Sequence, residues 1–212
     1  MQGYIETLQI KNKSLTETDK ELYLGIIQKS TEKLSSMVSQ LFEYSKLEAK
    51  QIEPQKEPFQ ISELANDVYN KYQKLAEAKN IEIKLESKKT LPLVFGDISL
   101  IERIIQNLMD NALKFTPQNG EVVIQITTNE KEVLVSVKDN GPGIPESEQL
   151  HIFERFKRSS SNKDSTSGAG LGLAIVKKII ELHESTIKVI SRPNQGTTFQ
   201  FNLPTYNTSL IS

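Results

Sequence analysis

The chain has 212 residues, and 26 Lys and Arg balance 27 Asp and Glu to a net charge of −1 at pH 7. This balance argues against a protein that binds nucleic acid by broad electrostatics, because such proteins carry a basic excess. The sequence has no cysteine and only two histidines, which excludes disulfides and thiolate metal sites and argues against a histidine-rich zinc centre. No stretch approaches the roughly 20 apolar residues of a membrane-spanning helix, so we expect no membrane contact by these residues.

Residues 1–52 contain no proline and have the pattern of helices. A short helical segment at 4–8 runs into a polar loop at 11–14, and Thr16 with Asp19 resembles a capping box that opens a longer helix. A four-three spacing typical of a coiled coil or bundle follows at Tyr23, Ile27, Ser30, Leu34, Met37, Leu41 and Tyr44. Because the apolar face is broader than two helices can bury, we expect a helical hairpin that forms half of a four-helix bundle made by two copies.

A linker is predicted at residues 53–58, where Pro54 and Pro58 stand among charges. It separates the hairpin from a second region at 59–205, which is followed by a short tail at 206–212. The expected elements of this region are helices at 61–78, 99–115 and 171–182, a short apolar run at 93–95, and strands at 81–85, 122–128, 133–137, 187–191 and 197–203. Because helices and strands do not alternate strictly, we expect an α+β fold with helices on one face of a mixed sheet.

The helix at 99–115 carries a polar stripe on an otherwise apolar surface. Its members are spaced four, four and three residues apart and so fall on one face: Arg103, Asn107, Asn111 and Lys114. Because an unpartnered buried amide costs about 1–3 kcal/mol, we expect the stripe to face a ligand or water. An amide oxygen suits Mg²⁺ that is already held by phosphates, and Lys114 adds a point charge for a phosphate oxygen. The alternative is a solvated helix face.

A second motif follows the strand at 133–137, which delivers Asp139 to its end just before Gly141 and Gly143. A carboxylate at this position can accept a hydrogen bond from an amino group, and the two glycines let the backbone approach a flat ring closely. An ordinary turn is the alternative, and it is the better interpretation of this motif alone.

A third motif is the glycine-rich run in which Gly168, Gly170 and Gly172 open a helix. Phosphates can rest on the exposed N–H groups at the positive end of such a helix. The spacing fits neither a dinucleotide fingerprint nor a phosphate loop ending in Gly-Lys-Ser/Thr, so the run is weak evidence on its own.

The segment before this run holds Phe153 and Phe156, which can anchor it against the core while Arg158 reaches toward a polyphosphate. A short amphipathic helix with surface charges is the alternative for this segment.

The order of these motifs resembles the nucleotide-binding domain of the sensor histidine kinases of two-component systems. It runs from the asparagine helix through Asp-x-Gly-x-Gly, Phe-x-x-Phe and Gly-x-Gly-x-Gly to Gly196-Thr197-Thr198-Phe199. Residues 91–97 resemble the family's lead-in to the asparagine helix, and residues 1–52 resemble its dimerisation and phosphotransfer hairpin. The resemblance covers nearly the whole chain and implies an ATP-binding α/β sandwich of the Bergerat type.

Carried over by position, the resemblance implies roles for single residues. Asn111 ligates Mg²⁺ with Asn107 beside it, and Asp139 accepts a hydrogen bond from the adenine amino group. Lys114 and Arg158 contact phosphates, and Arg158 helps the γ-phosphoryl group to leave. The remaining implied ATP contacts are Gly141, Gly143, Phe156, Gly168, Gly170, Leu171, Gly172 and Thr198.

The implied cofactors are ATP and Mg²⁺, and the implied activity is transfer of the γ-phosphoryl group to a histidine of the dimerisation domain. From there the phosphoryl group passes to an aspartate in the receiver domain of a response regulator. The resemblance also implies a homodimer through the N-terminal helices.

This sequence departs from the family pattern in several places. The family's acceptor lies in a run similar to His-Glu-Leu-Arg-Thr-Pro, which does not occur here. We therefore expect a cytoplasmic piece of a longer protein that is anchored to a membrane through upstream sequence. His151 and His183 are expected to be structural or solvent-facing. Glu184-Ser185 stands where relatives usually have two glycines, so this turn is expected to avoid left-handed backbone. Arg103 stands where many relatives have Gln, and the sequence leaves its role open.

Two other functions remain as alternatives. The first is an ATPase of the wider superfamily that includes gyrase, mismatch-repair and heat-shock chaperone ATPases, which use a Glu base on the asparagine helix. The matching residue here is Asn107, whose amide cannot accept a proton. The second is a non-catalytic dimerisation and signalling module, against which the retention of Asn111, Asp139 and the glycines argues.

Overall fold

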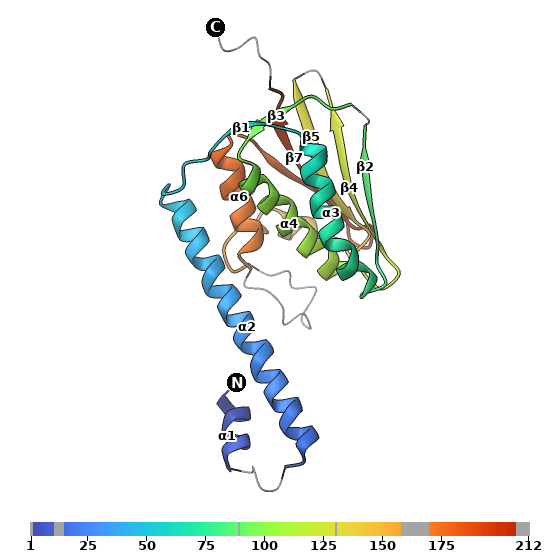
Figure 1. Ribbon diagram of the computed structural model, residues 1–212. Helices are drawn as coiled ribbons and strands as arrows, with labels where there is room; N and C mark the ends of the chain where they lie inside the picture. The colour runs from blue at the N-terminus through green and yellow to red at the C-terminus, as the bar shows by residue number, and fades with distance from the viewer. Residues whose placement is uncertain (1, 11–14, 89, 130, 158–169, 207–212) are drawn as a thin grey trace.

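The computed structural model describes residues 2–10, 15–88, 90–129, 131–157 and 170–206. It divides into an N-terminal pair of helices and an α+β region, as Figure 1 shows. Within these ranges, no helix is both long and apolar enough to cross a bilayer.

The N-terminal part consists of α1 (Gln2–Ile10) and the long α2 (Glu17–Glu48). The predicted capping box is confirmed, because Thr16 Oγ1 accepts the N–H of Asp19 and the Asp19 carboxylate accepts the N–H of Thr16. Much of α2 extends away from the α+β region (Figure 1). Large apolar side chains on α2 are exposed, namely Leu22, Leu24, Leu34, Val38, Leu41 and Phe42.

Five strands form the main sheet, in the order β2-β4-β5-β7-β6. Their bounds are β2 (Glu82–Ser87), β4 (Glu121–Thr128), β5 (Glu132–Asp139), β6 (Ile187–Ser191) and β7 (Thr197–Pro204). β2 pairs with β4 in parallel and the other neighbours pair antiparallel, so the sheet is mixed. The alternation of buried and exposed residues along β5 and β7 gives the sheet one apolar face and one polar face.

Three helices, α3 (Ile61–Glu77), α4 (Ile98–Phe115) and α6 (Gly172–Leu182), cover the apolar face of the sheet (Figure 1). They bury the core between themselves and the strands, with α4 between α3 and α6. A single turn, α5 (Glu146–Gln149), follows the Asp139 loop. The predicted α+β fold with helices on one face of a mixed sheet is confirmed.

The end of the predicted linker is itself a strand. β1 (Glu57–Phe59) pairs antiparallel with β3 (Val94–Gly96), so Pro58 lies opposite Phe95. Proline is tolerated there because β1 is an edge strand, with a partner on one side only. The linker is also tied to the helical layer, since the N–H of Gln55 donates to the Asp97 carboxylate at 2.8 Å.

The turn after α6 corrects one expectation. Glu184 has φ +55°, a left-handed conformation, although it is not glycine. The N–H of Glu184 donates to the carbonyl of Glu181 and the N–H of Ser185 donates to that of Ile180. These two bonds form a Schellman cap, which requires left-handed backbone at this position whatever the residue.

Candidate functional site

Asn107 lies on the buried side of α4, with 5% of its surface exposed. Its Nδ2 donates a hydrogen bond of 2.8 Å to the carbonyl of Arg103, one turn earlier. Gly172, the first residue of α6, comes so close that a Cβ there would lie 3.0 Å from Asn107 Oδ1. The N-terminus of α6, with its free N–H groups, therefore faces α4 at the amide of Asn107.

The next turns of α4 carry Asn111 and Lys114, both half-buried. Asn111 makes no side-chain hydrogen bond to any described part of the chain, so its amide is available to a ligand. The Lys114 ammonium lies 4.7 Å from the centre of the Phe115 ring. Arg103 leaves the predicted stripe, because its guanidinium pairs with Glu43 of α2. The predicted stripe thus keeps three members, Asn107, Asn111 and Lys114.

Asp139, at the end of β5, is a buried carboxylate with 7% of its surface exposed. Its Oδ1 accepts the N–H of Gly141 at 2.8 Å and the N–H of Thr197 at 3.2 Å. Burial raises the pKa of Asp139, and these two backbone hydrogen bonds oppose the rise. Across the described residues, no donor bonds to Oδ2. The side chain is therefore fixed by one oxygen while the other can accept a hydrogen bond from a ligand.

The loop after Asp139 is tightly packed against its neighbours. A Cβ on Gly141 would lie 2.9 Å from the carbonyl oxygen of Phe115, at the end of α4. Gly143 has φ +72°, and a Cβ there would meet the carbonyl of Arg192 at 2.0 Å. These glycines are thus needed for packing between the loop and two other elements, which ties the Asp139 carboxylate to the helix that carries Asn107 and Asn111.

The sequence pointed to Thr198, but the structure places Thr197 beside Asp139. In the β5–β7 pairing, Asp139 lies opposite Thr197, and Thr198 lies opposite Lys138. Since successive side chains of a strand point to opposite faces, Thr198 lies on the polar outer face, away from Asp139. Thr197 is buried, and its Oγ1 lies 3.0 Å from Ser191 Oγ. Thr197, and not Thr198, is therefore the threonine that lies beside Asp139.

The segment before residue 158 and the start of α6 meet through their backbones. The N–H of Phe156 donates to the carbonyl of Gly170 at 3.0 Å, and both residues are left-handed, with φ +60° and +71°. Phe156 is 59% exposed, whereas Phe153 packs edge-on against Phe199. Of the two phenylalanines, only Phe153 therefore packs against the core. The predicted contacts Arg158 and Gly168 lie outside the described residues.

Leu171 is implied among the ATP contacts, but its side chain belongs to the hydrophobic core. It is 1% exposed, and its carbonyl accepts the N–H of Ile175 in the first turn of α6. The side chain of Leu171 is therefore not accessible to a ligand at this end of α6.

Sequence comparisons identify the family to which this chain belongs. A profile of the family described as "Histidine kinase-, DNA gyrase B-, and HSP90-like ATPase" matches residues 96–207. The adaptive-response sensory kinase SasA of Synechocystis sp. is 39% identical over 174 residues, covering 82% of this chain and 45% of that protein. The sensor-like histidine kinase ycf26 of Porphyra purpurea is 33% identical over 216 residues, covering 96% of this chain and 33% of that protein. This chain belongs to the sensor histidine kinases.

Solved histidine kinases share the fold. Full-length ShkA, in complex with AMPPNP, matches with a TM-score of 0.78 and 29% identity, covering 94% of this chain and 42% of that chain. ThkA, in complex with the response regulator protein TrrA, matches with a TM-score of 0.78 and 28% identity, covering 96% of this chain and 56% of that chain. The chain spans less than half the length of SasA and ycf26. The family predicted from the order of the motifs is confirmed.

In this histidine kinase, His183 has a structural role, as expected. It is 5% exposed; its Nε2 accepts the N–H of Asp97 at 3.0 Å, and its Nδ1 lies 2.8 Å from the carbonyl of Ile179. Accepting at Nε2 and donating at Nδ1 requires a neutral ring, and burial lowers the pKa of His183. His151 is exposed and faces Glu154.

Asp97, which sequence reasoning passed over, is the N-cap of the site helix. Its carboxylate accepts the N–H of Leu100 and the hydroxyl of Ser99. Burial alone would raise the pKa of Asp97, but the hydrogen bonds from Ser99, Leu100 and Gln55 outweigh it and leave the pKa lowered. An Asp just before a helix is the signal that could have revealed this cap.

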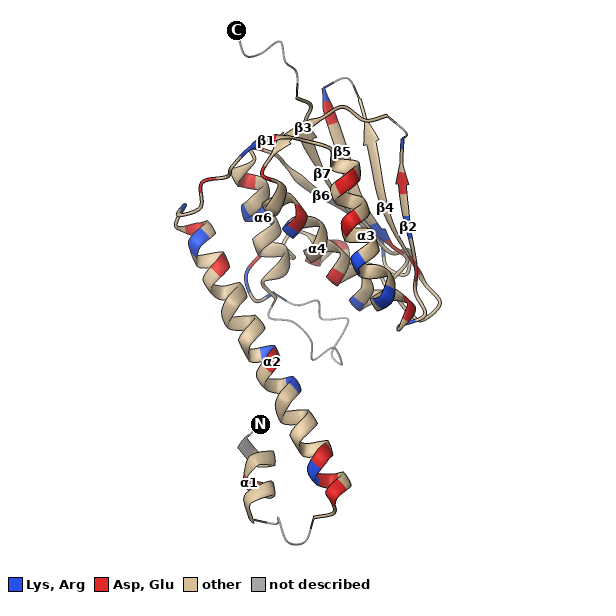
Figure 2. Cartoon of the chain, in the orientation of Figure 1, with Lys and Arg blue, Asp and Glu red and all other residues tan. Residues whose placement is uncertain are grey.

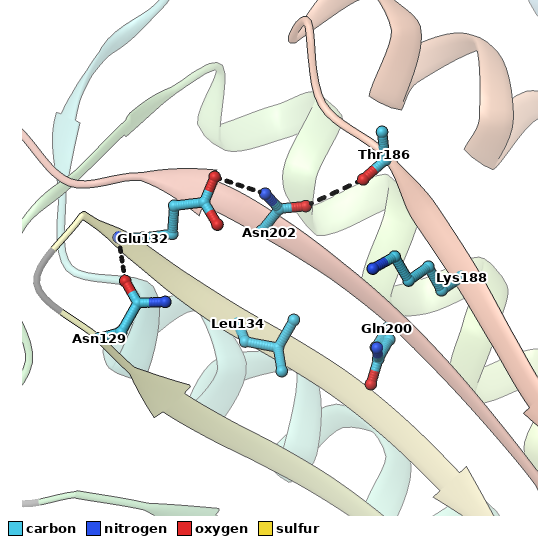
Figure 3. Close-up of a pocket in the computed structure, with 7 residues that line it drawn as sticks. All are labelled: Asn129, Glu132, Leu134, Thr186, Lys188, Gln200 and Asn202. Carbon is cyan, nitrogen blue, oxygen red and sulfur yellow. Dashed lines mark hydrogen bonds between the residues drawn. The ribbon is translucent and has the colours of Figure 1, made fainter.

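A shallow polar pocket lies on the other face of the sheet, as Figure 3 shows. It is lined by Asn129, Glu132, Leu134, Thr186, Lys188, Gln200 and Asn202. Asn202 donates to Glu132 and accepts from Thr186 (Figure 3). Because these polar groups bond to each other and lie across the sheet from Asp139, the pocket is separate from the candidate site.

Proposed function

We propose that this chain is the ATP-binding catalytic core of a sensor histidine kinase. In this proposal it transfers the γ-phosphoryl group of ATP to a histidine of the dimerisation domain, and from there the group passes to an aspartate of a response regulator. Family membership supports the proposal, and so does the likeness of the fold to ShkA, which was solved in complex with AMPPNP.

Asp139 is the observation that carries this function. A carboxylate with 7% exposure, held through Oδ1 by two backbone N–H groups, keeps Oδ2 for a further donor. An adenine amino group supplies such a donor. Asp139 Oδ2 is not among the buried side-chain atoms that lack a partner, so water or a ligand can reach it.

The phosphates are assigned to the other end of the site. Asn107, Asn111 and Lys114 lie on α4, which faces the N-terminus of α6 at Gly172, where N–H groups and the helix dipole favour anions. Lys114 provides positive charge, and Arg158 and Gly168 are proposed from the family pattern alone. Phosphoryl transfer needs mainly positioning and charge neutralisation, which these groups supply.

The residues present also fit a magnesium ion. Within the described ranges, no three His, Asp or Glu side chains cluster in a way that could hold a metal by themselves. Magnesium is bound through few protein oxygens and the phosphates of its ligand, and the available amide of Asn111 meets that need, with Asn107 beside it. When bound there, the ion would neutralise charge on the phosphates.

Asn107 favours transfer over hydrolysis. The ATPases of the wider superfamily use a carboxylate base at this position, and an amide cannot accept the proton of water. Here its Nδ2 is also occupied by the carbonyl of Arg103. An ATPase remains the second candidate function and predicts phosphate release without an acceptor.

Partners and boundaries complete the proposal. Exposed apolar residues on α2 support a homodimer through residues 1–52, with residues 59–205 as the catalytic domain. The complex of ThkA with TrrA supports a response regulator receiver domain as the second partner.

Calorimetric titration of the chain with ATP, with and without Mg²⁺, tests the proposal. We expect binding that strengthens with Mg²⁺, and Asp139→Asn should weaken it about 10–100-fold, the loss of a charged hydrogen bond of about 1.5–3 kcal/mol. Ser136→Ala, on the same strand but facing the opposite side, serves as the control. Equal affinity of Asp139→Asn and the unmodified chain would overturn the adenine assignment.

A further inference from the structure

The last turns of α2 are docked on the catalytic domain. Tyr44 and Leu47 are 6% and 2% exposed, in contrast to the exposed apolar residues earlier on the helix. α2 packs against α6 at this end (Figure 1). Apolar contact of this kind favours docking but is not directional, so something else must set the angle between α2 and the domain.

The first directional contact joins α2 to the site helix. Arg103 Nε donates to Glu43 Oε1 at 2.9 Å, and its Nη2 donates to Oε2 at 2.7 Å. The pair is partly shielded, with 33% and 26% of the two side chains exposed, and these hydrogen bonds raise the pKa of Arg103. A two-pronged contact between a planar guanidinium and a carboxylate fixes orientation as well as distance.

The second directional contact joins α2 to the segment that leads to Phe156. Arg155 Nη1 donates to Glu48 Oε2 at 3.2 Å, and the Arg155 guanidinium lies 5.2 Å from the centre of the Tyr44 ring. The Tyr44 hydroxyl in turn donates to Glu48 Oε1 at 3.3 Å. These are the two ion pairs between α2 and the catalytic domain in the described part of the chain. Residues 34–42 of α2 carry no charge, and Figure 2 shows an uncharged stretch of α2 before its last turns. Both acidic partners therefore belong to the final turns.

We propose that Arg103 and Arg155 are positioning residues, which set the orientation of the nucleotide domain on α2 through Glu43 and Glu48. α2 contacts the nucleotide domain at three elements, which are α4, α6 and the 151–157 segment. Three contacts fix the orientation of the domain relative to α2, whereas apolar contact alone would allow the domain to rotate. This assigns a role to Arg103, which the sequence left open. The importance of this orientation for phosphoryl transfer rests on the proposed function, because the bound nucleotide must be presented to an acceptor outside the catalytic domain.

Distances between two spin labels test the proposal directly, because the sequence has no cysteine. Labels at Ser36→Cys on α2 and Asn66→Cys on α3, both exposed positions, report the angle between the helix and the domain. The labelled chain is diluted into an excess of unlabelled chain, so that only distances within one chain are measured.

We expect a single narrow distance distribution in the unmodified chain, which broadens in Glu43→Gln/Glu48→Gln. Raising NaCl from about 0.1 to about 1 M should broaden it in the unmodified chain but not in that variant, since salt screens partly exposed ion pairs.

Matched variants separate the ion pairs from other effects. Adding Arg103→Gln to Glu43→Gln should not broaden the distance distribution further if the two residues act through each other. Glu32→Gln, far from the domain, should leave the distribution narrow. An unchanged distance in Glu43→Gln/Glu48→Gln, or broadening confined to Leu47→Ala, would overturn the proposal. ATP titration of the same variants should give unchanged affinity. Failure of ATP binding in all chains, the unmodified one included, would instead count against the proposed function.

Discussion

Glu184 holds a left-handed backbone that most non-glycine residues avoid. The Schellman cap at the end of α6 imposes this geometry, and the exposed side chain gains only a 3.8 Å ion pair with Lys56 in return. Asp139 is unfavourable for a different reason, because burial disfavours its charged form and raises its pKa. In the proposed function, that buried carboxylate binds adenine.

Replacing Glu184 by glycine should therefore stabilise the protein. Relief of the left-handed strain exceeds the entropy that glycine adds to the unfolded chain, and we expect a net gain of about 0.5–1 kcal/mol. Urea denaturation measures it. Lys177→Gly, an exposed position inside α6, should destabilise by about 1 kcal/mol instead. A loss of stability in Glu184→Gly would contradict the strain argument.

Among the elements, α4 and α6 are linked by a buried histidine. His183 at the end of α6 accepts the N–H of Asp97, the N-cap of α4, while the Asp97 carboxylate holds the linker at Gln55. The start of the site helix, the end of α6 and the linker thus meet at one point, and a proton on His183 Nε2 would break the contact.

Stability should accordingly fall as the pH is lowered from 7 to 5. Burial lowers the pKa of His183, so in this window the unfolded chain binds the proton and the folded one does not, and the free energy of unfolding rises with pH. Asp97 has a lowered pKa, so its contribution to the free energy of unfolding is lost only at more acidic pH. Asp139 has a raised pKa, so its effect on the free energy of unfolding has the opposite sign and falls as the pH rises.

Comparing variants isolates the contribution of His183 to the pH dependence of stability, because Asp97 and Asp139 are present in every variant. His183→Gln should give a shallower dependence of the melting temperature on pH than the unmodified chain. Parallel curves for His183→Gln and the unmodified chain would show that His183 does not titrate on unfolding.

For the whole molecule, α2 presents two different surfaces. Its final turns are buried on the catalytic domain, and its earlier turns expose Leu34, Leu41 and Phe42 at 54%, 47% and 66%. An apolar face of this length on a protruding helix is costly in water. A second copy, packing its own α1 and α2 against this face, would cover it.

We therefore expect light scattering to show a dimer at a chain concentration of about tens of micromolar, which corresponds to a dissociation constant in the micromolar range or below. Leu34→Ser/Leu41→Ser should shift it to a monomer with an intact catalytic domain, shown by retained ATP binding. Leu150→Ser removes a side chain that is 85% exposed on the catalytic domain and should leave the dimer in place. A monomeric unmodified chain would contradict the role assigned to α2.

The sequence by itself determined the family, the fold class and most elements, because these follow from short-range signals. The capping box at Thr16, the alternation in β5 and β7, and the order of the asparagine, aspartate and glycine motifs are all read within a few residues. The helix at 99–115 was predicted to within one residue of α4 for the same reason.

Only the tertiary structure decided which partners these residues have. Arg103 lies 60 residues from Glu43 and Asp97 lies 86 residues from His183, so no local pattern reports either contact. The choice of Thr197 over Thr198 depends on the register of β7 against β5, and the left-handed Glu184 depends on a cap made by hydrogen bonds. A side chain's chemistry is local, but its burial and its partners are set by segments that the fold brings together from far along the chain.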